Sequence, residues 1–315
     1  MAYEKRNIKK PEERIKIYRQ NSRYCIQKGL LKLMYRDNIN KKNQITVIIP
    51  LYKTPIKKIK VFDQYKNYRL IVLDQCPDKQ TGNKIRKLNL EYYSINKNIG
   101  LSRATNFLLS KVKTKYCLFT QADIVINSKS IDLLRDEIEQ KKNIIFSGPK
   151  FVKKFISKNM TVNINKSKII NNLNAACMMC HVKKLRKIGF FDDDFFLYWE
   201  DIFLMDKIKK SKYKMLYVPN ALAIHDGGKS TKKNFKIQFI RTSNFKYGEL
   251  LYAYKLNKNI FLKIVRQIIQ NTLFLTLNTV IFNINKILKN LAILTGILKF
   301  IKFYSFKKIS SLLNL

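Results

Sequence analysis

Short apolar runs typical of buried strands alternate with helical periods in the middle of the chain. The first run, Ile45–Ile49, is rich in β-branched residues and stops at Pro50. Similar runs lie at 70–73, 116–119, 144–146 and 215–218, and apolar residues at helical spacing fill 101–112 and 131–138. Strands alternating with helices predict an α/β fold with a mostly parallel central sheet flanked by helices. Ligands of such sheets gather at the carboxyl ends of the strands.

The C-terminal part predicts a basic amphipathic helix. Its apolar positions recur every three to four residues, at Ile269, Leu273, Leu277, Val280 and Ile284. Polar Asn, Gln and Thr side chains interrupt the uncharged stretch between Arg266 and Lys286. It is therefore a poor candidate for a membrane-spanning helix, which needs about 20 predominantly apolar residues. Two interpretations stay open: the helix lies in the interface of an anionic membrane, or it belongs to a helical subdomain that covers the preceding domain.

Composition narrows the class of partner. The 315 residues include 63 Lys and Arg against 21 Asp and Glu, a formal charge of +42, which attracts polyanions such as pyrophosphate groups, anionic lipid or nucleic acid. Codon drift in an AT-rich genome is the alternative explanation, because Ile and Asn are abundant as well. The lysine clusters lack the ordered aromatic residues of a nucleic-acid platform, so nucleic acid is not the expected partner.

The five cysteines form no regularly spaced framework, and no apolar segment follows the polar start of the chain. A signal peptide and disulfides are therefore not expected, and the chain is expected to stay in the cytoplasm. We expect three parts: a basic helical N-terminal extension over 1–43, an α/β domain over 44–230, and a basic amphipathic helical region over 231–315.

Two segments of the α/β domain suit a phosphorylated ligand. Gly100, in the stretch Asn98–Asn106, allows a tight backbone approach before a helix, and amides at a helix N-terminus suit an anion. Asp123 follows an apolar strand together with Gln121, and a carboxylate at a strand end supplies the hard oxygen that a divalent cation prefers.

A third segment carries candidate acid–base chemistry. Glu200 and Asp201 follow the aromatic run Phe195–Trp199 at the predicted start of a helix, where a carboxylate is favoured as an anion. His225 lies downstream of the strand that Pro219 closes, and its imidazole suits a metal or a phosphate.

Taken in order, four stretches resemble the family 2 glycosyltransferases of GT-A fold, particularly the rhamnosyltransferase-like branch. They are Ile45–Tyr52 with Leu70–Asp74, Asn98–Asn106, Thr120–Asp123, and Gly189–Asp201 with Met215–Pro219 and His225–Gly228. Together they span about residues 45–230. The family pattern has two acids separated by one residue, and Gln121 stands where the first of them is expected. A neutral amide is a weaker metal ligand than a carboxylate.

The resemblance implies a role for each matching residue. Asp201 would be the catalytic base, Trp199 and Glu200 would lie on the acceptor side, and Asp123 and His225 would bind a divalent metal, Mg²⁺ or Mn²⁺. The donor would be held by residues from the strand ends and the glycine turn, namely Pro50, Tyr52, Asp74, Asn98, Gly100, Gln121 and Asp123.

The expected function is that of an inverting hexosyltransferase. It would move a sugar from a nucleotide diphosphate sugar to a lipid-linked or glycan acceptor in cell-surface polysaccharide or lipopolysaccharide synthesis, on the cytoplasmic membrane face as a peripheral protein. Two alternatives from other classes stay open. Gln121 suggests a catalytically silent protein that only binds nucleotide sugars, and the charge alone suggests a basic nucleic-acid-binding protein.

Overall fold

The computed structural model describes residues 44–153, 166–225 and 234–312. The chain divides into two compact units, Met1–Gln44 and Ile45–Leu315. The predicted N-terminal extension over 1–43 and the segment Asp226–Gly228 lie outside the described residues. The three-part division of the chain stays a prediction.

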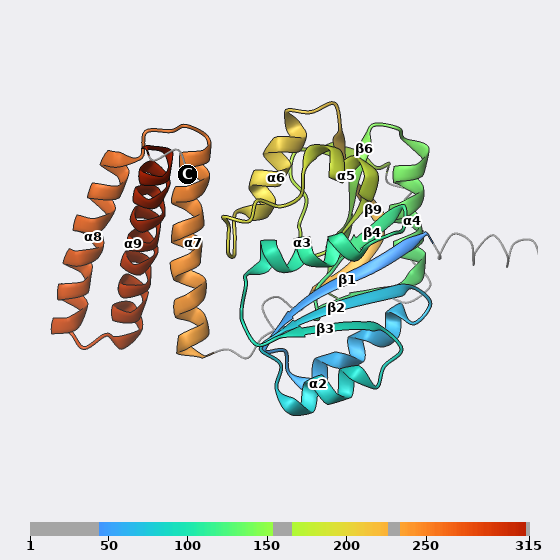
Figure 1. Ribbon diagram of the computed structural model, residues 1–315, viewed down its shortest axis with the longest axis horizontal. Helices are drawn as coiled ribbons and strands as arrows, with labels where there is room; N and C mark the ends of the chain where they lie inside the picture. Colours follow the sequence, from blue (N-terminus) through green and yellow to red (C-terminus); the bar gives the residue numbers. More distant parts are fainter. Residues whose placement is uncertain (1–43, 154–165, 226–233, 313–315) are drawn as a thin grey trace, which may run out of the picture. The chain divides into compact units, whose positions relative to one another are not determined.

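A nine-stranded mixed sheet forms the centre of the second unit within the described residues (Figure 1). Its strands follow the order β3-β2-β1-β4-β8-β6-β9-β5, and β7 pairs with β9. The strands are β1 (Ile45–Tyr52), β2 (Arg69–Gln75), β3 (Glu91–Ile95), β4 (Tyr116–Phe119), β5 (Ile124–Ile126), β6 (Ile144–Val152), β7 (Lys168–Ile170), β8 (Met178–His181) and β9 (Lys214–His225).

Parallel pairing dominates where the site lies. β1 pairs in parallel with both β2 and β4, β2 pairs in parallel with β3, and β6 with β9. The short strands β5, β7 and β8 pair antiparallel. The carboxyl ends of β1, β2 and β4 therefore meet at one edge, and the predicted α/β fold with a mostly parallel sheet is confirmed.

Helices cover both faces of the sheet. On one face η1 (Ile56–Tyr65), α2 (Lys79–Arg86) and α4 (Ser128–Gln140) contribute to one buried apolar cluster. On the other, α3 (Leu101–Lys111), α5 (Val182–Ile188) and α6 (Glu200–Lys209) contribute to a second cluster. Figure 1 shows α2 and α3 on opposite sides of β1–β3. Local capping sets the start of α4, where the Asn127 side chain accepts a hydrogen bond from the Ser130 amide at 2.8 Å.

Two strands run past the prolines that the sequence predicts as their ends. Pro50 lies inside β1, where it is paired with Leu73 of β2 but stands beyond the last pair with β4, Ile48 with Phe119. Pro219 lies inside β9 at a register shift, because Pro149 pairs with Val218 whereas Lys150 pairs with Leu222. A proline lacks an amide hydrogen, so a bulge or an unpaired side accommodates it within a strand.

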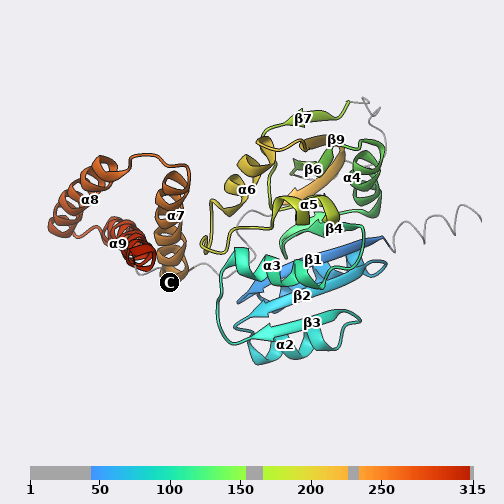
Figure 2. The ribbon, with the colours of Figure 1, turned by 45° about the horizontal axis from the view of Figure 1, so that its top comes forward.

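The C-terminal region forms three helices side by side, α7 (Phe235–Lys255), α8 (Phe261–Val280) and α9 (Ile284–Leu312) (Figure 2). The predicted apolar stripe does not follow one helix, because the chain turns after α8 and Ile284 begins α9. Phe282 in this turn has φ of 50°. Among the described residues, the helices are too short or too polar to cross a bilayer.

Candidate functional site

A cavity of about 400 Å³ lies at the carboxyl edge of the sheet. Its wall brings together eight of the residues predicted from the sequence: Pro50, Tyr52, Asn98, Gly100, Gln121, Glu200, Asp201 and His225. A smaller cavity of about 40 Å³ shares Gln121, Glu200 and Asp201 with the first. Three other predicted residues, Asp74, Asp123 and Trp199, are not among its lining residues in the described part of the chain.

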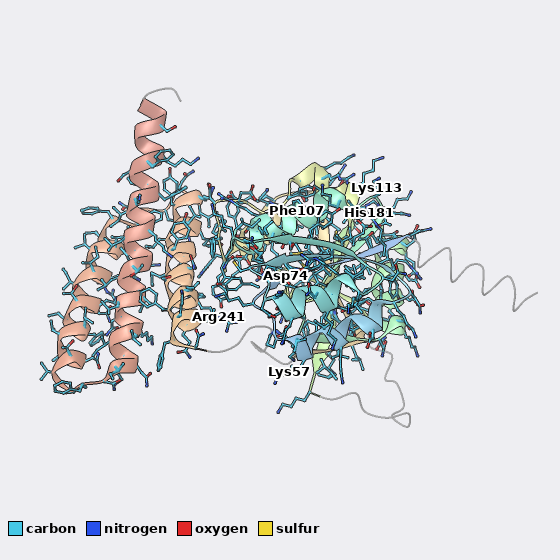
Figure 3. All side chains as sticks on the ribbon, turned by 60° about the horizontal axis from the view of Figure 1, so that its bottom comes forward. Lys57, Asp74, Phe107, Lys113, His181 and Arg241 are labelled. Carbon is cyan, nitrogen blue, oxygen red and sulfur yellow. The ribbon has the colours of Figure 1, made fainter. Side chains whose placement is uncertain are left out.

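Asp74 lies one residue before the end of β2 and is 1% exposed, and the Tyr92 hydroxyl donates a hydrogen bond to its Oδ2 at 3.3 Å. Burial raises the pKa of Asp74 to about 6. The next residue, Gln75, lines the cavity instead, and its Oε1 accepts a hydrogen bond from the Ile99 amide at 2.8 Å. Successive side chains of a strand point to opposite faces, so a strand-end motif alone does not tell which of two neighbours reaches the ligand. Figure 3 marks Asp74 and Arg241.

Position 100 requires a glycine, because of its backbone conformation and because of the atoms around it. Its φ is 88°, and a Cβ there would lie 2.4 Å from the carbonyl oxygen of Phe196. The Leu101 amide donates a hydrogen bond to the same oxygen at 2.7 Å, and Asn98 Oδ1 accepts one from the Gly100 amide at 3.0 Å. The turn before α3 thus holds the loop that leads to Glu200.

Asp123 and His225 meet through the pairing of β5 with β9, in which Ile124 lies opposite His225. His225 Nε2 is 3.7 Å from Asp123 Oδ2, and the carboxylate is fully buried whereas the imidazole is 26% exposed. No third His, Cys, Asp or Glu joins them within the described ranges. One carboxylate and one imidazole suit a divalent ion whose remaining ligands are diphosphate oxygens and water.

Glu200 and Asp201 form the first turn of α6, and both line the cavity. Asp201 Oδ1 accepts a hydrogen bond from the Ile202 amide at 2.9 Å, and burial raises the pKa of Asp201. Glu200 is 5% exposed, and its Oε2 has no hydrogen-bond partner among the described residues. Burial, with the Asp201 charge beside it, raises the pKa of Glu200 to about 8. At neutral pH Glu200 therefore keeps its proton.

Helix α7 supplies cavity residues that were not predicted from the sequence. Ile237, Ile240 and Arg241 line the cavity, and Arg241 is the one Lys or Arg among the described lining residues. Gln238 and Arg241 stand three residues apart in the chain, and this Gln-x-x-Arg pattern could have drawn attention to Arg241. A guanidinium at this wall suits the two charges of a diphosphate, because it can bind phosphate oxygens bidentately.

The same helix holds the loop that carries the acids. Tyr198 and Trp199 both have φ of 70°, and the Trp199 ring packs against Phe245 at 5.6 Å and Tyr252 at 5.1 Å between centroids. A Cβ on Gly248 would lie 2.8 Å from the Tyr198 carbonyl oxygen. Trp199 is thus part of the support of Asp201, at the residue just before α6.

Ion pairs between α7 and the loop that precedes α6 add to this support. Lys255 Nζ lies 2.9 Å from Asp192 and 2.7 Å from Asp194, and the Tyr247 hydroxyl donates a hydrogen bond to the Asp194 carbonyl at 3.2 Å. Close packing of the aromatic side chains and these ion pairs together hold the loop in place. The position of Asp201 therefore depends on the C-terminal helices.

The fold is that of the GT-A glycosyltransferases. A sequence model of the family described as Glycosyl transferase family 2 matches residues 46–204, about half of the chain. The chain belongs to glycosyltransferase family 2, and the expected family is confirmed. No curated protein sequence matches significantly.

One of two similar solved structures supports this fold. Mannosyltransferase PcManGT from Pyrobaculum calidifontis, solved with GDP-Man and Mn²⁺, has a TM-score of 0.50 at 13% identity. The match covers 67% of this chain and 64% of that one, so it spans somewhat less than two thirds of PcManGT. S. aureus TarS gives a TM-score of 0.46 at 14% identity over 69% of this chain and 72% of that chain.

Proposed function

We propose that this chain is an inverting glycosyltransferase in which Asp201 is the general base. Its donor would be a nucleotide diphosphate sugar and its acceptor a hydroxyl group. The observation that carries the proposal is the shared cavity wall of Asp201, Gln121, His225 and Arg241. It offers a carboxylate for the acceptor proton and a cationic side chain for the diphosphate within one space large enough for a ligand.

In the proposed reaction, the Asp201 carboxylate takes the proton of the acceptor hydroxyl while that oxygen attacks the anomeric carbon. A carbon–oxygen bond forms to the acceptor, and the bond to the diphosphate oxygen breaks with its electron pair leaving on the nucleoside diphosphate. One displacement inverts the anomeric centre, and no carboxylate nucleophile is needed, unlike in a retaining glycosidase. The raised pKa of Asp201 increases its proton affinity and so suits it to a base.

Charge on the departing diphosphate needs a counterpart. Arg241 would bind its oxygens, and Asp123 and His225 would hold a divalent ion, Mg²⁺ or Mn²⁺. Such an ion, when bound, neutralises negative charge on the diphosphate. The Mn²⁺ in the PcManGT complex supports the use of a divalent ion.

The remaining residues divide between donor and acceptor. Pro50, Tyr52, Asn98, Gly100 and Gln121 would border the donor, with Asp74 behind them supporting the end of β2. Protonated Glu200 can donate a hydrogen bond, which suits it to orient an acceptor oxygen beside Asp201. Trp199 would act through the loop that it holds.

The finer expectations form part of the proposal. The sugar would be a hexose, with rhamnose first by resemblance to the rhamnosyltransferase-like branch. The acceptor would be a lipid-linked or other glycan of a cell-surface polysaccharide, reached on the cytoplasmic face of a membrane. The parts over 1–43, 44–230 and 231–315 would act as extension, catalytic domain and helical region.

A screen of nucleotide sugars tests the donor directly. Binding should raise the melting temperature, because a ligand stabilises the state that binds it. Nucleotide-activated rhamnose, UDP and GDP sugars are compared with and without Mg²⁺ or Mn²⁺, and NMR of the product with a fitting acceptor should show an inverted anomer. Retention of configuration would contradict the single displacement.

The same screen separates the two alternatives. A catalytically silent binding protein, which the amide at Gln121 favours, would be stabilised by the donor yet release no nucleotide with any acceptor. A nucleic-acid-binding protein would bind DNA or RNA with a steep salt dependence and without competition from nucleotide sugars.

A further inference from the structure

Helix α8 turns its apolar side outward. Six apolar side chains follow one another at helical spacing, and they are 38–76% exposed: Leu262, Val265, Ile269, Leu273, Leu277 and Val280. We call these six residues the outer face of α8. The turn after the helix continues the pattern, with Ile281 63% and Phe282 86% exposed. Monomeric soluble proteins rarely expose a continuous apolar surface of this length.

The inner side of the same helix is partly polar. Asn271 and Asn278 are buried, at 8% and 7% exposed. Each amide donates a hydrogen bond to the backbone carbonyl four residues earlier, Asn271 to Gln267 at 2.8 Å and Asn278 to Phe274 at 2.5 Å. A water-facing helix shows the reverse arrangement, with its apolar stripe inside. The apolar outer face of α8 is therefore left uncovered by the described part of the chain.

The charge of the three helices selects the partner. Residues 235–312 contain 13 Lys and Arg and one acidic residue, Glu249. That glutamate pairs with Lys246 at 2.5 Å and Lys263 at 2.6 Å. A second copy of this chain would bring like charges together, whereas an anionic lipid surface is complementary to them.

We propose that the outer face of α8 and the turn at 281–282 insert into the interface of an anionic lipid bilayer. Twenty residues of helix extend over about 30 Å, which suits a helix that lies in the membrane plane. The basic side chains around it contact the lipid headgroups. The inference deepens the proposed function, since such a helix would bring the active site to a lipid-linked acceptor, and it rests on that function for its purpose.

Vesicle co-sedimentation tests the surface without any sugar transfer. The full chain is mixed with vesicles of phosphatidylcholine alone, or of phosphatidylcholine and phosphatidylglycerol at about seven to three, at low and high salt. The test variant combines Leu273→Ser with Leu277→Ser. The matched control combines Gln270→Ser with Thr276→Ser, two exposed polar positions on the same helix. Circular dichroism and thermal unfolding verify that both variants fold.

Wild type and control should bind the anionic vesicles, with weaker binding at high salt, and should leave neutral vesicles unbound. Each methylene group that enters a bilayer raises partitioning about fourfold. Binding of the test variant to the anionic vesicles should therefore be at least about tenfold weaker than that of wild type. Equal binding by test variant and control, binding to neutral vesicles as strong as to anionic ones, or no binding of wild type would overturn the proposal. So would a wild-type dimer in solution that the test variant dissolves.

Thermal stabilisation by nucleotide sugars is measured in parallel without vesicles. It should be the same in wild type, control and test variant, because the outer face of α8 does not line the cavity within the described residues. Loss of vesicle binding with intact donor binding identifies the surface, whereas absent donor binding with intact vesicle binding would count against the proposed function alone.

Discussion

Replacing Glu200 by glutamine should stabilise the folded protein at neutral pH. Glu200 is 5% exposed, and its Oε2 lacks a hydrogen-bond partner among the described residues. Burial and the neighbouring Asp201 charge raise its pKa from 4.5 to about 8. Glutamine has nearly the same shape and stays neutral in both the folded and the unfolded chain.

The magnitude follows from the two pKa values. Between about pH 4.5 and 8 the folded chain holds a proton on Glu200 that the unfolded chain releases, so the free energy of unfolding falls as pH rises through this window. Each pH unit contributes about 1.4 kcal/mol. At pH 7 the ionised glutamate of the unfolded chain therefore costs the protein about 3 kcal/mol of stability, and Glu200→Gln should recover a gain of that order.

Urea unfolding at pH 5, 6, 7 and 8 measures this gain. The difference in unfolding free energy between Glu200→Gln and wild type should grow with pH and level off above pH 8. Glu91→Gln, at a surface glutamate that pairs with Arg69 at 2.5 Å, is the control and should show no such growth. A difference for Glu200→Gln that stays constant from pH 5 to 8, or a less stable variant at pH 7, would refute the reasoning.

Three further changes probe the rest of the site. Gly248→Ala should lower kcat and cost about 1–3 kcal/mol in unfolding free energy, because its Cβ would meet the Tyr198 carbonyl at 2.8 Å; unchanged kinetics would show that α7 does not position Asp201. Arg241→Ala should weaken donor binding about tenfold, measured by calorimetry, through loss of a charge-assisted contact, and unaltered affinity would remove Arg241 from the donor site. Gln121→Asp should tighten Mn²⁺ binding, since a carboxylate is a better ligand than an amide; the same Mn²⁺ concentration dependence of activity in both proteins would argue against a metal held beside Asp123.

Local patterns were enough to predict five strands of the sheet, namely β1, β2, β4, β6 and β9. The run Ile45–Ile49 became β1, and Tyr116–Phe119 is β4 with the predicted bounds. These strands are buried on both faces, so each reads as continuous apolar sequence. Their ends were less predictable, because whether Pro219 stops a strand depends on the register shift between β6 and β9, which is a property of the partner strand.

Short motifs along the chain predicted eight residues that line the cavity, whereas residues outside those motifs were missed. Glu200 and Asp201 are neighbours at a helix start, a pattern that is visible in the chain itself. Arg241 reaches the cavity from α7, and Gln75 takes the cavity position that the sequence favoured for Asp74. Spacing along the chain does not encode such contacts, because they depend on packing between elements.

The C-terminal stripe shows a further limit of sequence reasoning. The spacing of Ile269, Leu273 and Leu277 predicted an apolar face, but not whether that face meets protein or another apolar surface. The packing shows that this face is turned away from the described neighbouring helices, because Asn271 and Asn278 occupy the inner side of α8. The spacing of apolar residues determines which residues share a face of the helix. Only the packing of the helix against its neighbours determines whether that face points toward the protein or away from it.

The central claim is tested most directly by measuring sugar transfer by the Asp201→Asn variant and by wild type at matched donor saturation. The amide preserves the shape of the side chain but takes up no proton. Donor affinity should remain within about twofold, while kcat should fall by about a hundredfold or more, as expected when a general base is removed. Turnover close to that of wild type would contradict the assignment of Asp201 as the base.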